Sequence, residues 1–345
     1  MTANGGALLE ITDLGVSFTT DEGMVRAVDG VSLAVHPGRT LGIVGESGSG
    51  KSVATKAVIR LLPANARIDG GSRILLRRAE GEIDIARLPA GGRELRRLRG
   101  GDIGMIFQEP MASFSPVYTI GNQMIEAILA HRDHLDRRLG RRFDRRAARD
   151  HAIRMLERVG MSNARLRIDQ YPHELSGGMR QRAMIALALS THPSLLIADE
   201  PTTALDVTIQ AQILDLMLEL QRELGMAMLF ITHDMGVIAR IAEEVAVMYL
   251  GRIVERGPTR EVIRDPAHPY TRGLLAALPR VETSRRRLTP VPGDIPSPLQ
   301  RPAGCPFHTR CPRRMPGLCD REVPADTALD ARRSVACHLF GGRAS

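Results

Sequence analysis

The chain has 345 residues, of which 43% are hydrophobic and only 3% aromatic, with no tryptophan. This length suits one large α/β domain with a smaller appendage, and the core must be aliphatic. The formal net charge of +8 is compatible with an anionic partner. The chain has few aromatic side chains to stack on bases and no nucleic-acid-binding motif, so we expect no nucleic-acid partner.

The hydropathy pattern argues against a membrane-spanning chain. No apolar run in the sequence approaches the roughly 20 residues that cross a bilayer. The first residues do not resemble a signal peptide. We therefore expect the chain to stay in the cytoplasm and to reach a membrane through partners.

The first predicted elements are strands at 11–19 and 25–31, joined by a turn. Residues 40–44 form a short apolar run that predicts a buried strand, and the pattern at 52–62 predicts a helix. A glycine-rich loop lies between these two elements. Strand, loop and helix in this order are the context that a phosphate-binding loop needs.

The middle of the chain is predicted to be mainly helical. A strand is predicted at 103–107, and residues 119–190 follow a helical pattern. Residues 131–149 are dense in Arg and Asp. This run suits a solvated helix face or loop, and a specific docking surface is the alternative.

A strand–helix–strand unit is predicted next. Residues 195–198 and 228–231 read as buried parallel strands, and 208–224 as the helix between them. A terminal strand pair is predicted at 245–257. From about residue 279 the prolines become frequent, which predicts an extended, loop-rich tail with a boundary near residue 282.

The glycine-rich loop matches the complete GxxxxGK[ST] pattern. Its glycines allow backbone N–H groups to turn toward phosphates, Lys51 neutralises the β- and γ-phosphates, and the Ser52 hydroxyl binds Mg²⁺. We therefore expect ATP to be bound by Gly45, Glu46, Ser47, Gly48, Ser49, Gly50, Lys51 and Ser52.

Two acidic residues end the predicted strand at 195–198. Asp199 is expected in the Mg²⁺ shell, and Glu200 is placed to polarise the attacking water. An Asp-Glu pair alone is more often a solvated strand end. In a chain with a phosphate-binding loop, the pair predicts a nucleotide hydrolase.

A third motif lies 23 residues before Asp199. Alone it would suit a simple helix start, with a serine cap and flexible glycines. After a phosphate-binding loop it resembles the LSGGQ signature of ABC ATPases, with Met in place of the usual Gln. The motif consists of Leu175, Ser176, Gly177, Gly178 and Met179.

Other segments resemble further motifs of the same family. Residues 107–110 resemble its Q-loop around Gln108, and residues 231–234 its switch histidine, His233. Phe18 occupies the place of an aromatic residue that stacks on adenine. The segment that resembles the D-loop contains Thr203, Ala204, Leu205 and Asp206.

The resemblance extends to a subfamily. Residues 251–255, 268–275 and 304–312 are similar to the ATPase subunits of oligopeptide and dipeptide importers. Nickel and glutathione importers belong to the same subfamily, so these solutes remain alternatives. A soluble ABC ATPase acting on ribosomes or DNA is a rival reading, but it usually carries two cassettes or a long coiled-coil insertion. A P-loop kinase would have no use for the signature.

The resemblance implies an architecture. It implies an α/β P-loop NTPase (RecA-like) core with an antiparallel β subdomain and a helical subdomain at about 109–185. The nucleotide-binding domain would span 1–282, and a loop-rich, cysteine-containing extension would span 283–345.

The resemblance also implies a mechanism. Two cassettes close face to face, so that the signature of one meets the ATP held by the other. Glu200, His233 and Gln108 would be catalytic, and Ser52, Gln108 and Asp199 would hold Mg²⁺. The implied partners are two permease subunits, a second ATPase subunit and a periplasmic solute-binding protein. The location implied is the cytoplasmic face of the bacterial membrane, as a peripheral protein.

All four cysteines lie in the tail, with the spacing C-x5-C-x7-C-x17-C. A cytosolic chain seldom forms disulfides, so this clustering indicates a metal or cofactor site. The spacing differs from a common zinc knuckle, and four thiolates suit a four-iron four-sulfur cluster, which similar tails can carry. Zinc and free thiols remain the alternatives for Cys305, Cys311, Cys319 and Cys337.

Overall fold

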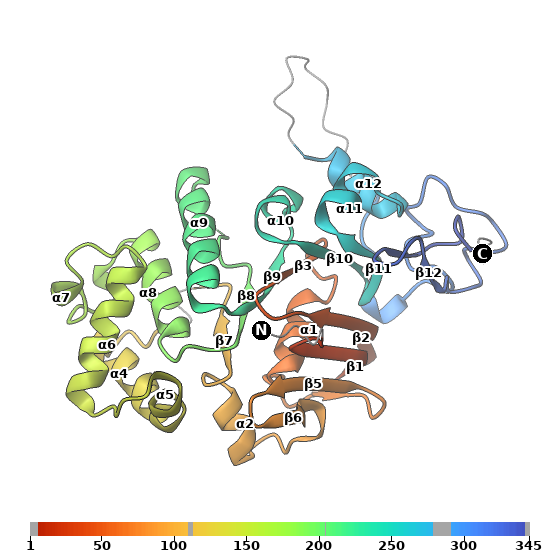
Figure 1. The fold of residues 1–345 in the computed structure, drawn as a ribbon. Helices are drawn as coiled ribbons and strands as arrows, with labels where there is room; N and C mark the ends of the chain where they lie inside the picture. Colours follow the sequence, from red (N-terminus) through yellow and green to blue (C-terminus); the bar gives the residue numbers. More distant parts are fainter. Residues whose placement is uncertain (1–5, 110–112, 204, 279–290, 342–345) are drawn as a thin grey trace. The chain divides into compact units, whose positions relative to one another are not determined.

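The computed structural model describes residues 6–109, 113–203, 205–278 and 291–341 (Figure 1). The chain divides into two compact units. Unit 1 consists of Met1–Leu8, Val35–Arg39 and Leu88–Ile231. Unit 2 consists of Leu9–Ala34, Thr40–Arg87 and Thr232–Ser345.

Unit 2 contains an antiparallel sheet with the order β2-β1-β5-β6, in which β4 also pairs with β1. The buried residues of β1 include Leu9, Ile11, Leu14 and Val16, and their alternation shifts by one residue around Asp13, which has a left-handed φ of 49°. The two predicted strands at 11–19 and 25–31 are confirmed and are longer than expected, whereas β4 to β6 were not predicted. The strands are β1 (Leu9–Thr20), β2 (Gly23–Val35), β4 (Ala66–Ile68), β5 (Arg73–Arg78) and β6 (Gly81–Asp84).

A second group of strands in unit 2 carries the phosphate-binding loop. Every residue of β3 (Thr40–Val44) is buried, as predicted, and β3 pairs in parallel with β10 (Glu244–Tyr249). Strand β11 (Arg252–Pro258) pairs antiparallel with β10. Helix α1 (Lys51–Val58) follows the loop after β3.

Helix α1 ends four residues earlier than the predicted helix at 52–62. Arg60 adopts a left-handed φ of 53°, which is incompatible with a continuing helix. The N–H of Leu61 donates to the Lys56 carbonyl at 2.8 Å and that of Arg60 to the Ala57 carbonyl at 2.9 Å. These bonds close the helix as in a Schellman motif.

The remaining helices of unit 2 are short. Asp234 caps α10 by accepting from the N–H of Gly236 at 2.7 Å, and α10 packs on β3. His268 caps α12 by accepting from the N–H of Tyr270 at 3.0 Å. These helices are α10 (Met235–Ile241), α11 (Thr259–Arg264) and α12 (Pro269–Ala276).

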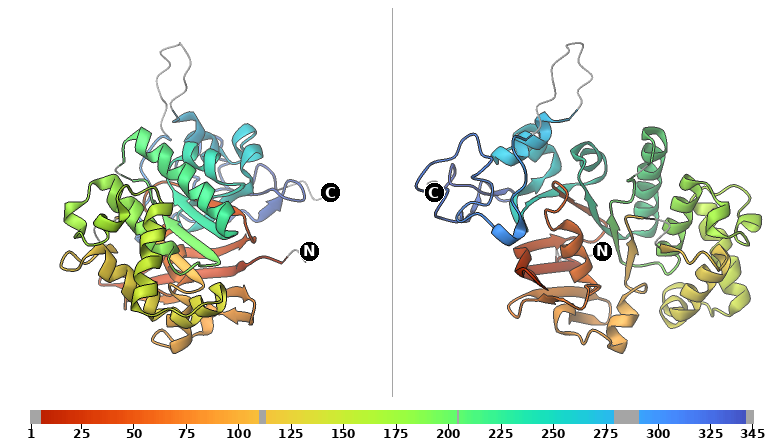
Figure 2. Two further views of the ribbon diagram at one scale, coloured as in Figure 1. Left: turned by 60° about the vertical axis from the view of Figure 1, so that its left-hand side comes forward. Right: turned by 180° about the vertical axis from the view of Figure 1, so that it is seen from behind.

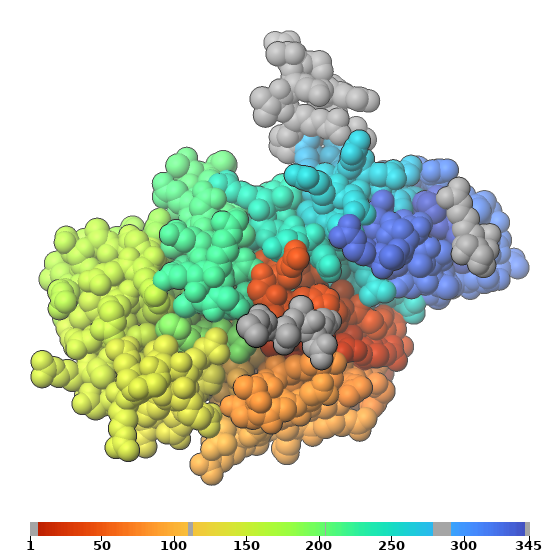
Figure 3. Space-filling model, in the orientation of Figure 1, coloured from red at the N-terminus to blue at the C-terminus, as the bar shows by residue number. Residues whose placement is uncertain are grey.

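The C-terminal residues are loop-rich, as predicted, yet they add two strands. β13 (Ser334–Ala336) pairs antiparallel with β11, and β12 (Asp326–Ala328) pairs with β13. Val335 is fully buried in a small core with Ala267 and Cys337. Figure 3 shows the C-terminal part of the chain in blue, packed against the cyan residues that precede it in the sequence. The boundary expected near 282 lies outside the described residues.

Unit 1 contains three parallel strands in the order β9-β8-β7. Helix α9 (Val207–Leu224) connects β8 to β9, which confirms the predicted strand–helix–strand unit. The strands are β7 (Ile103–Ile106), β8 (Leu195–Asp199) and β9 (Ala227–Thr232).

The predicted helical stretch of unit 1 is confirmed. Helix α6 packs against α4 and α8, and these helices lie together in both views of Figure 2. Among residues 6–109, 113–203, 205–278 and 291–341, no helix is long and apolar enough to cross a membrane. The helices of unit 1 before α9 are α2 (Arg93–Leu98), α4 (Ile120–Ala130), α5 (Arg132–Leu139), α6 (Arg145–Arg158), α7 (Ala164–Arg167) and α8 (Gly177–Leu189).

Candidate functional site

The phosphate-binding loop of unit 2 is closed around its lysine. The Lys51 ammonium group donates to the Gly45 carbonyl at 2.7 Å and to the Glu46 carbonyl at 2.9 Å. Lys51 is only 4% exposed. A buried cation held by backbone carbonyls at the start of a helix suits the binding of a phosphate chain.

Glycines allow the backbone of this loop to pass close to its neighbours. Gly50 has a φ of +100°, and a Cβ there would lie 2.5 Å from the Ala27 carbonyl oxygen. A Cβ on Gly45 would overlap the Met248 carbonyl oxygen. At Gly48, where φ is +77°, a Cβ would meet nothing within 4 Å. The loop is therefore tight at Gly45 and Gly50, and open around the Gly48 Cα.

Glu46 is held on two sides by residues from far along the chain. Its carboxylate receives two hydrogen bonds from Arg310, at 2.7 and 3.1 Å. Its backbone N–H donates to the Tyr270 hydroxyl at 2.9 Å. Burial raises the pKa of Tyr270, so this phenol remains protonated. Sequence reasoning did not assign a role to Arg310 or Tyr270.

The acidic pair lies in unit 1. Asp199 is the last residue of β8 and is 2% exposed. Glu200 follows with a left-handed φ of 47°. Its Oε2 atom accepts a hydrogen bond from the Thr203 hydroxyl at 3.1 Å and a longer one from the Gln108 side-chain amide at 3.5 Å. The structure thus brings Gln108 and Glu200 together and adds Thr203, which sequence reasoning placed only in the D-loop.

The signature of unit 1 forms the start of α8. The Ser176 hydroxyl caps this helix by accepting from the N–H of Met179 at 3.4 Å. Ser176 and Gly177 are exposed, Gly178 and Met179 are half-buried, and Leu175 is buried. The exposed serine and glycine offer a hydroxyl and backbone N–H groups at a helix N-terminus.

The segment after Glu200 leads into α9. Asp206 caps α9 by accepting from the N–H of Ile209 at 2.9 Å. Leu205 is half-buried, whereas Ala204 lies outside the described residues. The Gln181 side-chain amide donates to the Pro201 carbonyl, which links the signature helix α8 to this segment.

Two predicted residues lie in unit 2. His233 is exposed and directly follows β9. Phe18 is half-buried in β1, where it pairs with Ala66 of β4. Unit 2 therefore carries the phosphate-binding loop, Phe18 and His233. Unit 1 carries Gln108, the acidic pair, the signature and the D-loop segment.

The cysteines of the tail are mostly buried. Only Cys311 is partly exposed. Burial raises the pKa of Cys305 to about 11 and also raises the pKa values of Cys311 and Cys337. These thiols are therefore protonated at neutral pH. Across the described parts of the chain, no three His, Cys, Asp or Glu side chains are grouped so that they could hold a metal ion.

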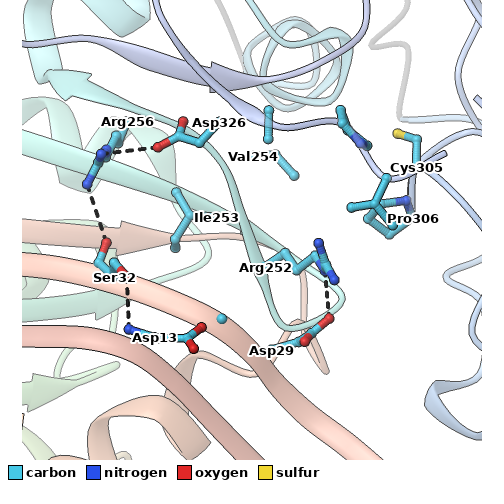
Figure 4. A pocket seen from close by; sticks show the side chains of 14 residues that line it. Asp13, Asp29, Ser32, Arg252, Ile253, Val254, Arg256, Cys305, Pro306 and Asp326 are labelled. Atoms are coloured by element: carbon cyan, nitrogen blue, oxygen red, sulfur yellow. Dashed lines mark hydrogen bonds and ion pairs between the residues drawn. The ribbon is translucent and has the colours of Figure 1, made fainter. Parts of the chain in front are cut away.

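A pocket of about 400 Å³ lies in unit 2, beside β11 and the tail (Figure 4). Arg252 pairs with Asp29 at 2.6 Å, and Arg256 pairs with Asp326 at 3.1 Å. Cys305 also lines the pocket. No residue of the phosphate-binding loop lines it, so this pocket is not the nucleotide site.

Two family models match the chain. The model described as "ABC transporter" matches residues 28–203. The model described as "Oligopeptide/dipeptide transporter, C-terminal region" matches residues 254–319. The first match contains the phosphate-binding loop, the signature and the acidic pair. The second contains Tyr270 and Arg310.

Curated relatives match nearly the whole chain. The dipeptide transport ATP-binding protein DppD of Bacillus subtilis is 46% identical over 338 residues, covering 98% of this chain and 96% of that protein. The oligopeptide transport ATP-binding protein OppD of Salmonella typhimurium is 47% identical over 330 residues, covering 96% and 93%.

The fold is also similar to a solved structure. The dimeric, post-hydrolysis structure of the ATP-binding cassette MJ0796 bound to ADP and Pi has a TM-score of 0.62 and 23% identity. The match covers 73% of this chain and 99% of that one. This likeness agrees with the α/β P-loop fold predicted from the sequence.

Proposed function

Because the chain belongs to the ABC transporter family, we infer that it is the ATP-binding and ATP-hydrolysing subunit of an importer for dipeptides or oligopeptides. The near-full-length identity to DppD and OppD carries this inference. Both of these relatives are named for peptide transport, which favours peptides over nickel or glutathione and favours transport over a soluble ABC ATPase.

The phosphate-binding loop is proposed to hold the triphosphate. Lys51 is buried at the start of α1, where its ammonium group can exchange carbonyl partners for phosphate oxygens. Ser52, Gln108 and Asp199 are the proposed Mg²⁺ ligands. The ion would neutralise charge on the β- and γ-phosphates. The proposed ATP contacts are Phe18, Gly45, Glu46, Ser47, Gly48, Ser49, Gly50, Lys51 and Ser52.

Glu200 is the proposed general base. Thr203 and Gln108 donate to its Oε2 atom, which orients the carboxylate and leaves it an acceptor for a water proton. His233 and Gln108 are proposed to stabilise the γ-phosphate. Phosphoryl transfer depends mainly on such positioning and charge stabilisation.

Two cassettes are proposed to close over ATP. The exposed Ser176 and Gly177 at the start of α8 are available to a second chain. A similar cassette, MJ0796, has been solved as a dimer with ADP and Pi, which supports this arrangement. The residues proposed to meet the partner's ATP are Leu175, Ser176, Gly177, Gly178 and Met179, and the D-loop residues are Ala204, Leu205 and Asp206.

The further partners are proposed to be two permease subunits and a periplasmic solute-binding protein, with the chain peripheral on the cytoplasmic face of the membrane. The stretch between Gln108 and Ser176 is the proposed docking region. Large apolar side chains are exposed there, since Val117 is 70% and Tyr118 57% exposed. Exposed apolar residues of this kind suit a protein partner.

We propose that the cassette spans 1–282, with its helical subdomain at about 109–185, and that the extension spans 283–345.

A further proposed cofactor is an iron–sulfur cluster on the four cysteines. Thiol chemistry suits it, but the grouping of side chains in the described residues does not, so no step depends on it. Iron and acid-labile sulfide measured on anaerobically purified protein test it, and four free thiols with neither component would end it.

Peptide uptake in cells tests the main proposal. A deletion strain that carries Glu200→Gln should lose uptake of labelled peptides, because losing a general base costs roughly 10²–10⁴ in rate. The purified variant should still bind ATP and should form an ATP-dependent dimer with its partner ATPase. The control is Lys51→Ala, which removes the phosphate contact and should lose both ATP binding and ATP-dependent dimer formation. Normal peptide uptake with Glu200→Gln, or loss of metal uptake instead, would refute the proposal.

A further inference from the structure

We propose that Arg310 of the C-terminal extension is a positioning residue for ATP binding, acting through Glu46 of the phosphate-binding loop. The inference rests on the proposed function, because it assumes that this loop binds ATP. The extension would then contribute to ATP binding through Glu46, independently of any metal on its cysteines.

The contact between Arg310 and Glu46 is bidentate. Nη1 lies 2.7 Å from Oε2, and Nη2 lies 3.1 Å from Oε1. Paired hydrogen bonds of this kind fix the carboxylate in both position and angle. The two residues are 264 positions apart in the chain, so the extension, and not the loop's own neighbours, supplies this restraint.

Arg310 is itself held firmly. Its side chain is 4% exposed. Nε donates to the Pro292 carbonyl at 3.0 Å, and Nη2 donates to the Val291 carbonyl at 3.2 Å. The guanidinium also lies 5.8 Å from the centre of the Tyr249 ring. All three of its nitrogens therefore have partners, and two of them are held by carbonyl groups outside the phosphate-binding loop.

Burial alone would lower the pKa of Arg310, but hydrogen bonds with Glu46 and Tyr249 raise it overall. The guanidinium therefore stays charged. Replacing it with an apolar side chain would leave the Glu46 carboxylate without its strongest partner in a half-buried place.

Glu46 is also held through its backbone. The Tyr270 hydroxyl accepts from its N–H at 2.9 Å. Tyr270 packs against Tyr249 and Phe307, with ring centres 4.7 and 5.3 Å away. Phe307 belongs to the extension, so the same part of the chain supports both restraints on Glu46.

The restraint reaches Lys51, the proposed phosphate ligand, through one further hydrogen bond. The Glu46 carbonyl accepts from the Lys51 ammonium at 2.9 Å. The residue that Arg310 fixes is therefore one of the two whose carbonyls position Lys51. A displaced Glu46 carbonyl would move one of the groups that hold the Lys51 ammonium, so the contact between Lys51 and the phosphates should weaken and ATP should bind less tightly.

The test compares full-length variants. Arg310→Met removes the guanidinium group. Arg310→Lys keeps the positive charge but cannot make the paired hydrogen bonds. Glu46→Gln keeps the shape of the side chain without its charge. The control is Arg301→Met, because Arg301 also ties the extension to the core, through Asp29 at 2.7 Å and the Leu250 carbonyl, outside residues 45–52. Thermal stability, the affinity for a fluorescent ATP analogue, and the KM and kcat for Mg-ATP are measured for each.

Arg310→Met should raise the KM for ATP about tenfold while kcat falls by no more than about threefold, the signature of lost ground-state binding. Arg310→Lys should be intermediate, because a point charge does not replace a planar fork. In the double variant Arg310→Met with Glu46→Gln, the KM for ATP should rise no further than in the more affected single variant, as expected for one shared contact. Arg301→Met should lower thermal stability and leave KM unchanged.

An unchanged KM in Arg310→Met would overturn the inference, as would an equal rise in Arg301→Met. If Arg310→Met does not fold, Arg310→Lys and Glu46→Gln carry the same comparison. Failure of the wild-type chain to bind ATP would refute the proposed function instead, so the two failures are distinguishable.

Discussion

The phenolic oxygen of Tyr270, in helix α12, accepts a hydrogen bond of 2.9 Å from the backbone N–H of Glu46, in the phosphate-binding loop. This bond gives the Glu46 N–H an acceptor outside the loop. It also makes α12 a support of the loop, although 224 positions separate the two residues.

Tyr270→Phe should lower the free energy of unfolding by about 1–3 kcal/mol, because the Glu46 N–H loses its acceptor. Urea denaturation measures this change. Tyr249→Phe is the matched control, since Tyr249 is equally buried and its hydroxyl makes only a long contact of 3.5 Å with Arg310. Equal losses in both variants would show that the Tyr270–Glu46 bond adds nothing beyond the general cost of removing a buried hydroxyl.

Two glycines of the loop should differ in their tolerance of alanine. Gly48→Ala places a Cβ in open space and should cost about 1–2 kcal/mol, from the left-handed backbone alone. Gly50→Ala also has a positive φ, of +100°, and brings its Cβ to 2.5 Å from the Ala27 carbonyl oxygen, which should add about 1–3 kcal/mol. Urea denaturation compares the two, and an equal cost would contradict the close approach at Gly50.

Thr203→Val should slow ATP hydrolysis about 3- to 10-fold, well short of the roughly 10²–10⁴ expected for losing a general base. The reason is that Glu200 loses the 3.1 Å hydrogen bond that orients it. ATP affinity should not change. Steady-state hydrolysis measures the effect, and Thr203→Ser, which keeps the hydroxyl, should behave as the wild type. A fully active Thr203→Val would remove this residue from the site.

Two histidines should make the helical part of unit 1 sensitive to acid. His151 and His192 stack with ring centres 5.5 Å apart, and burial lowers the pKa of each to about 4. Their unfolded pKa is about 6.5, so the unfolded chain binds more protons between these values. The stability that their neutral forms provide is complete above pH 6.5 and is lost as the pH falls toward 4.

When the pH is lowered from 7.5 to 5, we expect each histidine to lower the free energy of unfolding by about 1–2 kcal/mol. His192→Asn should reduce this pH dependence, and asparagine tolerates the left-handed φ of 54° at that position. Urea denaturation at the two pH values is the measurement. The prediction fails if the variant and the wild type lose the same stability.

Local patterns in the sequence predicted the parts of the fold that are locally determined. The phosphate-binding loop, β3 and α1 are consecutive, so one short motif specifies them. In the strand–helix–strand unit around α9, the two strands are continuous apolar runs and the helix has a long apolar periodicity. These patterns predict the type of each element without ambiguity. The acidic pair is recognisable because it ends a fully buried strand.

The short strands of the antiparallel sheet were less predictable. β5 begins and ends with arginines, and β6 has only four residues. Their strand form depends on pairing with β1 and with each other, and such pairing leaves no periodic signal in a short segment. The three-residue strand β13 forms by pairing with β11 on one side and with β12 on the other.

The contact between Arg310 and Glu46 had no signal in the sequence either. The chain has 47 Lys plus Arg residues, so the sequence does not distinguish Arg310 from the other arginines. The His268-Pro269-Tyr270 segment was noticed only for its resemblance to a subfamily. Its hydrogen bond with the loop depends on the tertiary fold, which brings α12 to the loop that follows β3.

The pairing of β13 with β11 bears on how this protein can be shortened. A version ending after α12 would remove β13 from one edge of β11 and expose the backbone groups at Glu255 and Arg256, which invites intermolecular strand addition and aggregation. It would also uncover Ala267, which now packs on Val335. We therefore expect soluble expression of the cassette to depend on the last 60 or so residues, which a boundary drawn from motifs alone would discard.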